Sequence, residues 1–111
     1  MIQNPISYGR QYITDEDIAA VVEALKSDYL TQGPKIKEFE DKMAAYCGAK
    51  YNVLVSNGTA GLHLTAMALG IQPGDKIITT PITFVASANG FRYCGAEVMF
   101  CDINKDNFLL D

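Results

Sequence analysis

The sequence predicts an α/β fold built on a mainly parallel sheet, and three observations lead to this prediction. Short apolar runs at residues 53–55, 76–80 and 97–101 have the β-rich composition of buried strands. Helical segments of about ten residues separate these runs, and turn-forming residues mark each junction. Strands joined by helices of this kind pair in parallel, so we expect the chain to form one layered α/β domain or part of one.

The composition and net charge of the chain indicate which classes of binding partner are not expected. The chain has 111 residues, of which 49% are hydrophobic and 20% charged, as is usual for a globular protein with one core. The net charge is −4 and no run of Lys or Arg occurs, so nucleic acid is not expected as a partner. No secretory leader or membrane-spanning stretch is visible, so we expect no membrane partner and a cytoplasmic location.

Neither the cysteines nor the histidine indicates a metal site. Cys47, Cys94 and Cys101 are odd in number and form no Cys-x-x-Cys pair, so we expect buried thiols rather than a disulfide framework or a zinc site. His63 has no Glu or second His at metal-binding spacing, and a hydrogen-bonded packing residue is the interpretation we favour.

The first 34 residues read as an arm, a helix and a loop. Residues 1–13 show no helical period and are interpreted as an extended arm. Thr14 is the predicted N-cap of a helix that runs to about residue 27, with three acidic residues in its first turn. Residues 28–34 form a loop, and a second helix spans residues 35–46 and ends at Gly48. We therefore divide the chain into residues 1–34 and residues 35–111.

Residues 53–64 look like a strand, a turn and the start of a helix that runs from Thr59 to about residue 69. The first backbone N–H groups of a helix have no partners inside it and favour an anion such as phosphate. Gly58 permits close approach of the backbone to a ligand, and Thr59 adds a hydroxyl donor. A capped helix without any ligand is the alternative.

Phe84 follows the strand at residues 76–80 and is expected to open a third short helix that runs to about residue 93. In a parallel sheet, Gly58-Thr59 and Thr83-Phe84 would both lie beyond the carboxyl ends of their strands, where open α/β sheets bind ligands. An aromatic ring could then stack on Phe84, although packing of Phe84 into the core is the alternative.

Several segments together resemble one family. They are Leu30-Thr31-Gln32-Gly33-Pro34, Ser56-Asn57-Gly58-Thr59-Ala60, Pro73-Gly74-Asp75, Thr83-Phe84-Val85-Ala86-Ser87-Ala88-Asn89 and Phe100-Cys101-Asp102-Ile103. In this order they resemble the DegT/StrS family of sugar aminotransferases, which depend on pyridoxal 5′-phosphate. The resemblance covers essentially the whole chain and implies the N-terminal portion of the large domain of a type I aminotransferase, incomplete after residue 111. The segments at residues 8–13 and 81–84 are most similar to the branch acting in pseudaminic acid biosynthesis.

The resemblance implies roles for individual residues. Gly58, Thr59 and Ala60 would bind the cofactor phosphate, and Phe84 would stack on the pyridine ring. The implied substrates are a UDP-linked 4-keto-6-deoxy-N-acetylhexosamine and an amino donor, expected to be glutamate. Residues implied to contact the sugar nucleotide are Tyr8, Asp28, Tyr29, Leu30, Thr31 and Gly58. The family also forms its active site between the two subunits of a homodimer.

No lysine of the chain fits the covalent anchor of the cofactor, because all seven are expected on helix faces, turns or loops outside the pocket. No catalytic residue is therefore assigned, and we expect the chain alone to be inactive. Two alternatives remain open. One is a related sugar dehydratase in which histidine replaces the lysine, and the other is a self-contained, non-catalytic nucleotide- or phosphate-binding module. We also expect exposed apolar surface on the sheet rather than on the helix that begins after Thr14.

Overall fold

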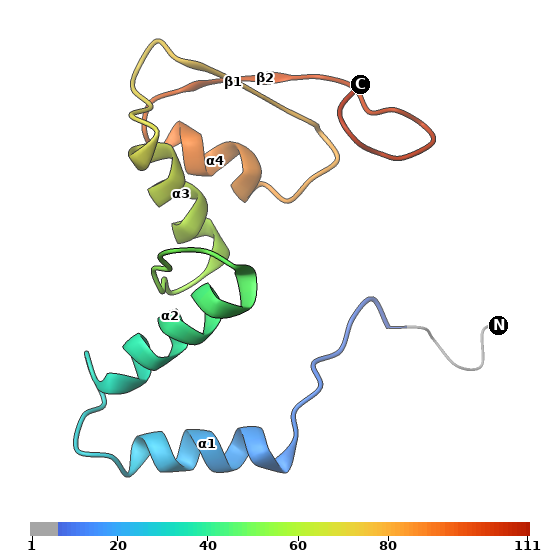
Figure 1. Cartoon of the computed structure of the whole chain (residues 1–111). Helices are drawn as coiled ribbons and strands as arrows, with labels where there is room; N and C mark the ends of the chain where they lie inside the picture. Colours follow the sequence, from blue (N-terminus) through green and yellow to red (C-terminus); the bar gives the residue numbers. More distant parts are fainter. Residues whose placement is uncertain (1–6) are drawn as a thin grey trace, which may run out of the picture. The chain divides into compact units, whose positions relative to one another are not determined.

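The computed structural model describes residues 7–111 (Figure 1). Backbone contacts divide the chain into two compact units, one ending at Leu54 and one running from Val55 to Asp111. Each unit is considered by itself. The boundary that we expected at residue 34 concerns the domains of the family fold, and it stays a prediction.

The first unit contains α1 (Asp15–Leu25) and α2 (Pro34–Cys47). Thr14 is the N-cap of α1, as predicted, and forms a capping box with Asp17: each side chain accepts a hydrogen bond from the backbone N–H of the other residue. The helix ends at Leu25, two residues before the predicted end.

Helix α2 has the expected start and stop residues at its two ends. Pro34 occupies the first turn, where its missing N–H costs no intrahelical hydrogen bond. Gly48 ends the helix in the left-handed conformation, with φ of 66°. The prediction of a helix over residues 35–46 that stops at Gly48 is therefore confirmed.

The second unit contains α3 (Gly58–Ala68), β1 (Lys76–Thr79), α4 (Ala86–Arg92) and β2 (Glu97–Phe100). The two strands pair in parallel, with Lys76 opposite Glu97 and Thr79 opposite Phe100. Helix α4 contacts both strands and α3 (Figure 1). The α/β class and the parallel pairing are confirmed.

Small residues allow α3 and α4 to pack closely. The buried side chains of the described residues are all alanines, namely Ala66 on α3, Ala86 and Ala88 on α4, and Ala96 before β2. Gly90 of α4 is also buried, and a Cβ atom placed on it would lie 2.8 Å from Cβ of Leu62. The α3–α4 contact therefore has no room for a side chain at this point.

Two predictions about elements are wrong. Residues 53–55 form no strand, because a strand needs backbone hydrogen bonds to a neighbouring strand and this segment makes none within residues 7–111. Its one hydrogen bond in that range is to a side chain. There the backbone N–H of Leu54 donates to Oε1 of Glu40 at 2.9 Å. Helix α4 begins at Ala86 rather than Phe84, so Phe84 lies in the loop before the helix.

The predicted distribution of exposed apolar surface is also wrong. The sheet does expose Ile78 and Phe100, as expected. However, Val21 and Leu25 of α1 are 60% and 63% exposed, so α1 presents its apolar side chains as well. We assumed that an amphipathic helix would find a covering partner, which periodicity alone does not guarantee. Cys47, which we expected to be buried, is exposed.

Candidate functional site

Two backbone donors are open at the start of α3. Asn57 is the N-cap, and its side-chain Oδ1 accepts the N–H of Ala60 at 2.9 Å. The N–H of Gly61 donates to the carbonyl oxygen of Asn57. The N–H groups of Gly58 and Thr59 have no partner within residues 7–111. These two groups lie at the positive end of the helix dipole and can bind an anion.

A cavity of about 560 Å³ adjoins this helix start. Its walls come from α3, the loop before α4, and the first turn of α4, and the residues that line it are Asn57, Gly58, Thr59, Leu62, Phe84, Ala86 and Ser87. The structure thus brings three of the predicted cofactor-binding residues, Gly58, Thr59 and Phe84, to one cavity. Phe84 is 74% exposed, so its ring is not packed in the core. Ala60 does not line the cavity.

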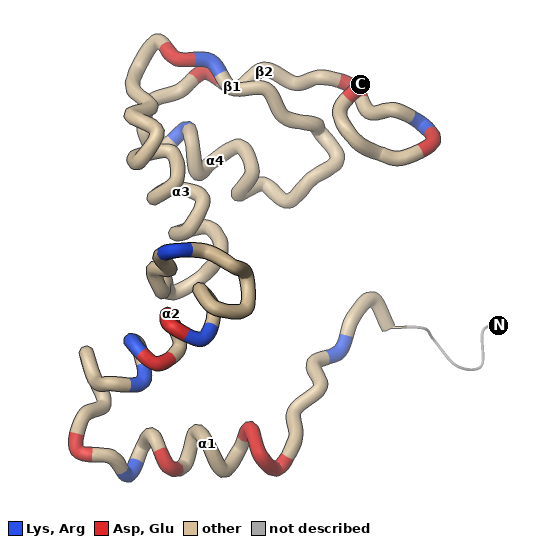
Figure 2. Tube along the Cα trace, in the orientation of Figure 1, with Lys and Arg blue, Asp and Glu red and all other residues tan. Residues whose placement is uncertain are grey.

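The walls of this cavity carry no charge. No Lys, Arg, Asp or Glu occurs in residues 51–74 or 77–91, and Figure 2 shows these stretches without charged positions. An anion in the cavity would therefore be held by backbone N–H groups and hydroxyls of this chain rather than by a cationic side chain of its walls.

Four residues of the cavity wall were missed from the sequence, and two of them, Asn57 and Ser87, are polar. Asn57 is the cap that fixes the first turn of α3, and its place before Gly58 is typical of an N-cap. Ser87 lines the cavity, and its Oγ lies 3.0 Å from Oγ1 of Thr83. Only its position three residues after Phe84 could have indicated it.

The predicted sugar-nucleotide residues other than Gly58 belong to the first unit. Tyr8 is fully exposed. Tyr29 and Leu30 line an apolar hollow of about 250 Å³ against α1 and α2, whereas Asp28 and Thr31 do not. Their contact with a sugar nucleotide stays a prediction.

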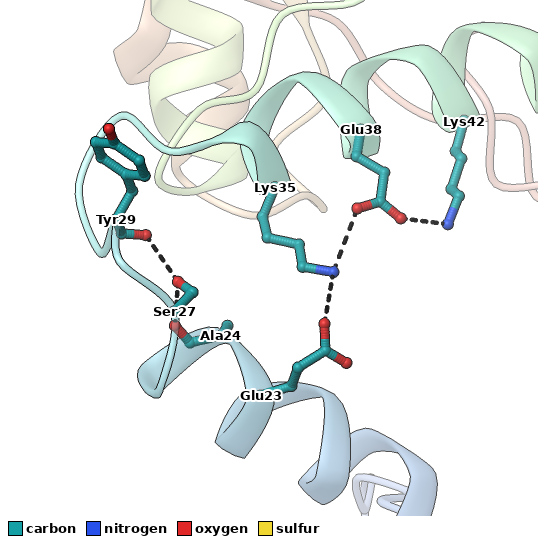
Figure 3. A network of polar contacts seen from close by, with 7 residues as sticks. All are labelled: Glu23, Ala24, Ser27, Tyr29, Lys35, Glu38 and Lys42. Atoms are coloured by element: carbon teal, nitrogen blue, oxygen red, sulfur yellow. Dashed lines mark hydrogen bonds and ion pairs between the residues drawn. The ribbon is translucent and has the colours of Figure 1, made fainter.

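A hydroxyl and a glycine shape the loop that carries Tyr29. Oγ of Ser27 lies 2.7 Å from the carbonyl oxygen of Ala24 and 3.1 Å from that of Tyr29 (Figure 3). A Cβ atom on Gly33 would lie 2.8 Å from the same Tyr29 oxygen. The loop therefore folds back tightly between α1 and α2.

An ion-pair network joins α1 to α2 (Figure 3). Nζ of Lys35 lies 3.4 Å from Oε1 of Glu23 and 3.3 Å from Oε2 of Glu38, and Nζ of Lys42 lies 2.7 Å from Oε1 of Glu38. Hydrogen bonds to Glu38 and then Glu23 raise the pKa of Lys35, while those from Lys42 and Lys35 lower the pKa of Glu38. Lys35 thus joins carboxylates of both helices.

His63 packs against an aromatic ring. Its ring meets that of Tyr93 edge to face, with centroids 5.3 Å apart and an interplanar angle of 70°. Residues 7–111 contain no group of three side chains suited to a metal ion. In the same range, every helix is too short or too polar to cross a membrane.

A protein-family model matches residues 11–111, and it is that of the DegT/DnrJ/EryC1/StrS aminotransferase family. The match covers the second unit, most of the first, and every segment that indicates the family, whereas residues 8–10 lie outside it. The chain belongs to this family.

Relatives of assigned function support the membership. The chain is 44% identical over 102 residues to the UDP-4-amino-4,6-dideoxy-N-acetyl-beta-L-altrosamine transaminase of Campylobacter jejuni, covering 91% of this chain and 27% of the relative. It is 40% identical over 102 residues to the UDP-4-amino-4-deoxy-L-arabinose–oxoglutarate aminotransferase of Shewanella sediminis, covering 92% and 26%. The chain thus spans about a quarter of the length of these relatives.

Solved structures show the same fold. A protein of Streptococcus pneumoniae assigned as a sugar aminotransferase, in its pyridoxal-phosphate form, superposes with a TM-score of 0.89 at 34% identity over 96% of this chain and 27% of its own. The GDP-4-keto-6-deoxy-D-mannose-3-dehydratase of Escherichia coli gives 0.83 at 27% identity over 92% and 28%.

Pyridoxal phosphate is the cofactor of the family. The cavity fits this group on two counts. The open N–H groups of Gly58 and Thr59 suit a phosphate, and the exposed ring of Phe84 suits an aromatic heterocycle.

Proposed function

We propose that this chain forms one wall of the cofactor site of a pyridoxal-phosphate-dependent nucleotide-sugar aminotransferase. The observation that carries the proposal is the single cavity shared by the start of α3 and Phe84. A phosphate donor set and an aromatic face side by side match the two ends of the cofactor.

In this proposal the N–H groups of Gly58 and Thr59, with the Thr59 hydroxyl, bind the phosphate. Phe84 stacks on the pyridine ring. Ala60 contributes its N–H only if Asn57 gives up the cap, because Oδ1 of Asn57 already accepts that group. Its small side chain nevertheless leaves the helix start accessible to the phosphate.

The proposed substrate is a UDP-linked 4-keto-6-deoxy-N-acetylhexosamine, aminated at C4 with glutamate as donor. The support is the 44% identity to the altrosamine transaminase together with the segments at residues 8–13 and 81–84. Tyr8, residues 28–31 and Gly58 would contact this substrate. We further propose a homodimer in the cytoplasm.

When bound, the cofactor supplies an electron sink for transfer of the amino group. The residues of this chain would hold and orient it. The lysine that anchors the cofactor and moves the proton is proposed to lie outside these 111 residues, so the chain alone would not turn over.

A sugar dehydratase is the second candidate, and the likeness to the E. coli dehydratase favours it. Both candidates use the same cofactor wall. The discriminating observation is whether a lysine or a histidine stands at the anchoring position. A self-contained phosphate-binding module is the alternative from another class, and a stable monomeric domain that binds phosphate but not the cofactor ring would favour it.

Titration with pyridoxamine 5′-phosphate tests the proposal, because this form of the cofactor has no aldehyde and cannot react with surface lysines. In the protein as its gene encodes it, we expect T59A and F84A each to weaken binding about tenfold. The control is T65A, since the Thr65 hydroxyl donates to the carbonyl of Gly61 outside the cavity. Equal affinity in all four proteins would contradict the proposed site.

A further inference from the structure

A second hydroxyl lines the proposed cofactor cavity, and it comes from α4 rather than from α3. Ser87 belongs to the first turn of α4 and is half-buried. It shares the cavity wall with Thr59 and Phe84. Its Oγ lies 3.0 Å from Oγ1 of Thr83, four residues earlier, and either oxygen can be the donor of that hydrogen bond.

The donors on the α3 side are few for a phosphate dianion. A phosphate group has three terminal oxygens, each able to accept more than one hydrogen bond. Since the cap uses the N–H of Ala60, α3 offers only the N–H groups of Gly58 and Thr59 and the Thr59 hydroxyl. Within residues 7–111, no cationic side chain lines the cavity. Any further hydroxyl on its wall is therefore valuable to the ligand.

The proton count at the hydroxyl pair leaves one donor free. Thr83 and Ser87 have one hydroxyl proton each, and their mutual contact uses one of them. If Thr83 donates to Ser87, the Ser87 proton is free, and Ser87 is the member of the pair that lines the cavity. An anion there would favour this orientation, because a hydroxyl that accepts one hydrogen bond donates a stronger one.

We propose that Ser87 is a further phosphate-binding residue of the cofactor site and that Thr83 orients its hydroxyl. The inference rests on the proposed function, since it assumes that the cavity takes the cofactor phosphate. The Ser87 hydroxyl would add a donor from α4 to those of α3, so that both helices would bind the same phosphate.

The experiment compares three probes in the protein as its gene encodes it: pyridoxamine 5′-phosphate, pyridoxamine and inorganic phosphate. In S87A we expect about tenfold weaker binding of the two phosphate-bearing probes and unchanged binding of pyridoxamine. S87T, which keeps a hydroxyl, should recover most of the affinity. T83V should show a smaller loss, about threefold, because the Ser87 hydroxyl remains but is no longer oriented.

T65A is the matched control, because it removes a hydroxyl that lies outside the cavity. A thermal melt without any probe should be the same for S87A and the parent protein. The inference is overturned if S87A binds all three probes like the parent, or if it loses pyridoxamine as strongly as the phosphate-bearing probes. If the parent binds pyridoxamine 5′-phosphate and S87A binds it with the same affinity, only this inference is overturned. A parent that binds no pyridoxamine 5′-phosphate overturns the proposed function as well.

Discussion

The two units of the chain are stabilised in different ways. In the unit that ends at Leu54, α1 and α2 carry most of that unit's charged side chains, including the acidic first turn of α1 (Figure 2). Ion pairs link charged side chains along α2. In the unit from Val55 to Asp111, the helices carry almost no charge and pack through alanine and glycine.

The difference indicates which unit is more sensitive to small changes in side-chain size. The first unit is defined by local signals, namely caps and ion pairs at helical spacing, each of which contributes little by itself. The second unit depends on close approach of α3 and α4, which places the start of α3 beside Phe84. A small change there should disturb the cavity, whereas similar changes in the first unit should be tolerated.

The largest effect is expected for G90A. The added Cβ would lie 2.8 Å from Cβ of Leu62 and 3.2 Å from the backbone nitrogen of His63, so α3 and α4 must move apart. Overpacking of this kind lowers the free energy of unfolding by about 2 kcal/mol. Denaturant unfolding measures it. G61A is the control, because its Cβ would meet only Val55 at 3.6 Å. Equal stability of both variants would show that the helices do not pack as described.

A smaller effect is expected for T14A. The variant removes the side chain that accepts the N–H of Asp17 at the start of α1. Loss of an N-cap lowers helix stability by about 1 kcal/mol. Amide hydrogen exchange should show faster opening at the start of α1 and no change in α3 or α4. Faster exchange in α3 would contradict a purely local role of the Thr14 cap.

The same cap predicts a pH dependence. Hydrogen bonds from the backbone N–H and the hydroxyl of Thr14 hold the pKa of Asp17 below its ordinary value of 3.8. Because the folded pKa is the lower one, the stabilising contribution is complete above the ordinary pKa and is lost as the pH falls through the folded pKa. Carboxyl NMR titration should show a depressed pKa for Asp17 that rises only part of the way toward 3.8 in T14A, because the variant removes the hydroxyl donor and keeps the backbone N–H, which is the larger cause. An unshifted Asp17 in the parent protein would rule out the capping box in solution.

The smallest effect is expected for K35M. This variant removes the cation that joins Glu23 to Glu38, but all three side chains are exposed to solvent. Exposed ion pairs contribute little to folding, so the unfolding midpoint should hardly change. The pKa of Glu38 should rise, because it loses one of two lysine partners. A large loss of stability in K35M would show that the ion-pair network contributes substantially to the free energy of unfolding.

Features set by local sequence patterns were predicted in both units, whereas features that depend on contacts between distant segments were not. Thr14, Gly48 and the parallel strands were predictable, because caps and strand–helix alternation are local patterns. The absence of a strand at residues 53–55 was not, since pairing depends on a distant segment. Within the site, Gly58, Thr59 and Phe84 followed from motifs. Ser87 did not, because only the folded cavity shows which face of α4 lines it.

The most direct test of the central claim is a crystal structure of the protein, as its gene encodes it, with pyridoxamine 5′-phosphate. We predict phosphate oxygens within about 3.2 Å of the backbone nitrogens of Gly58 and Thr59, with the pyridine ring on the face of Phe84. A cofactor bound elsewhere, with the start of α3 contacting only solvent, would contradict the assignment of this cavity as the cofactor site.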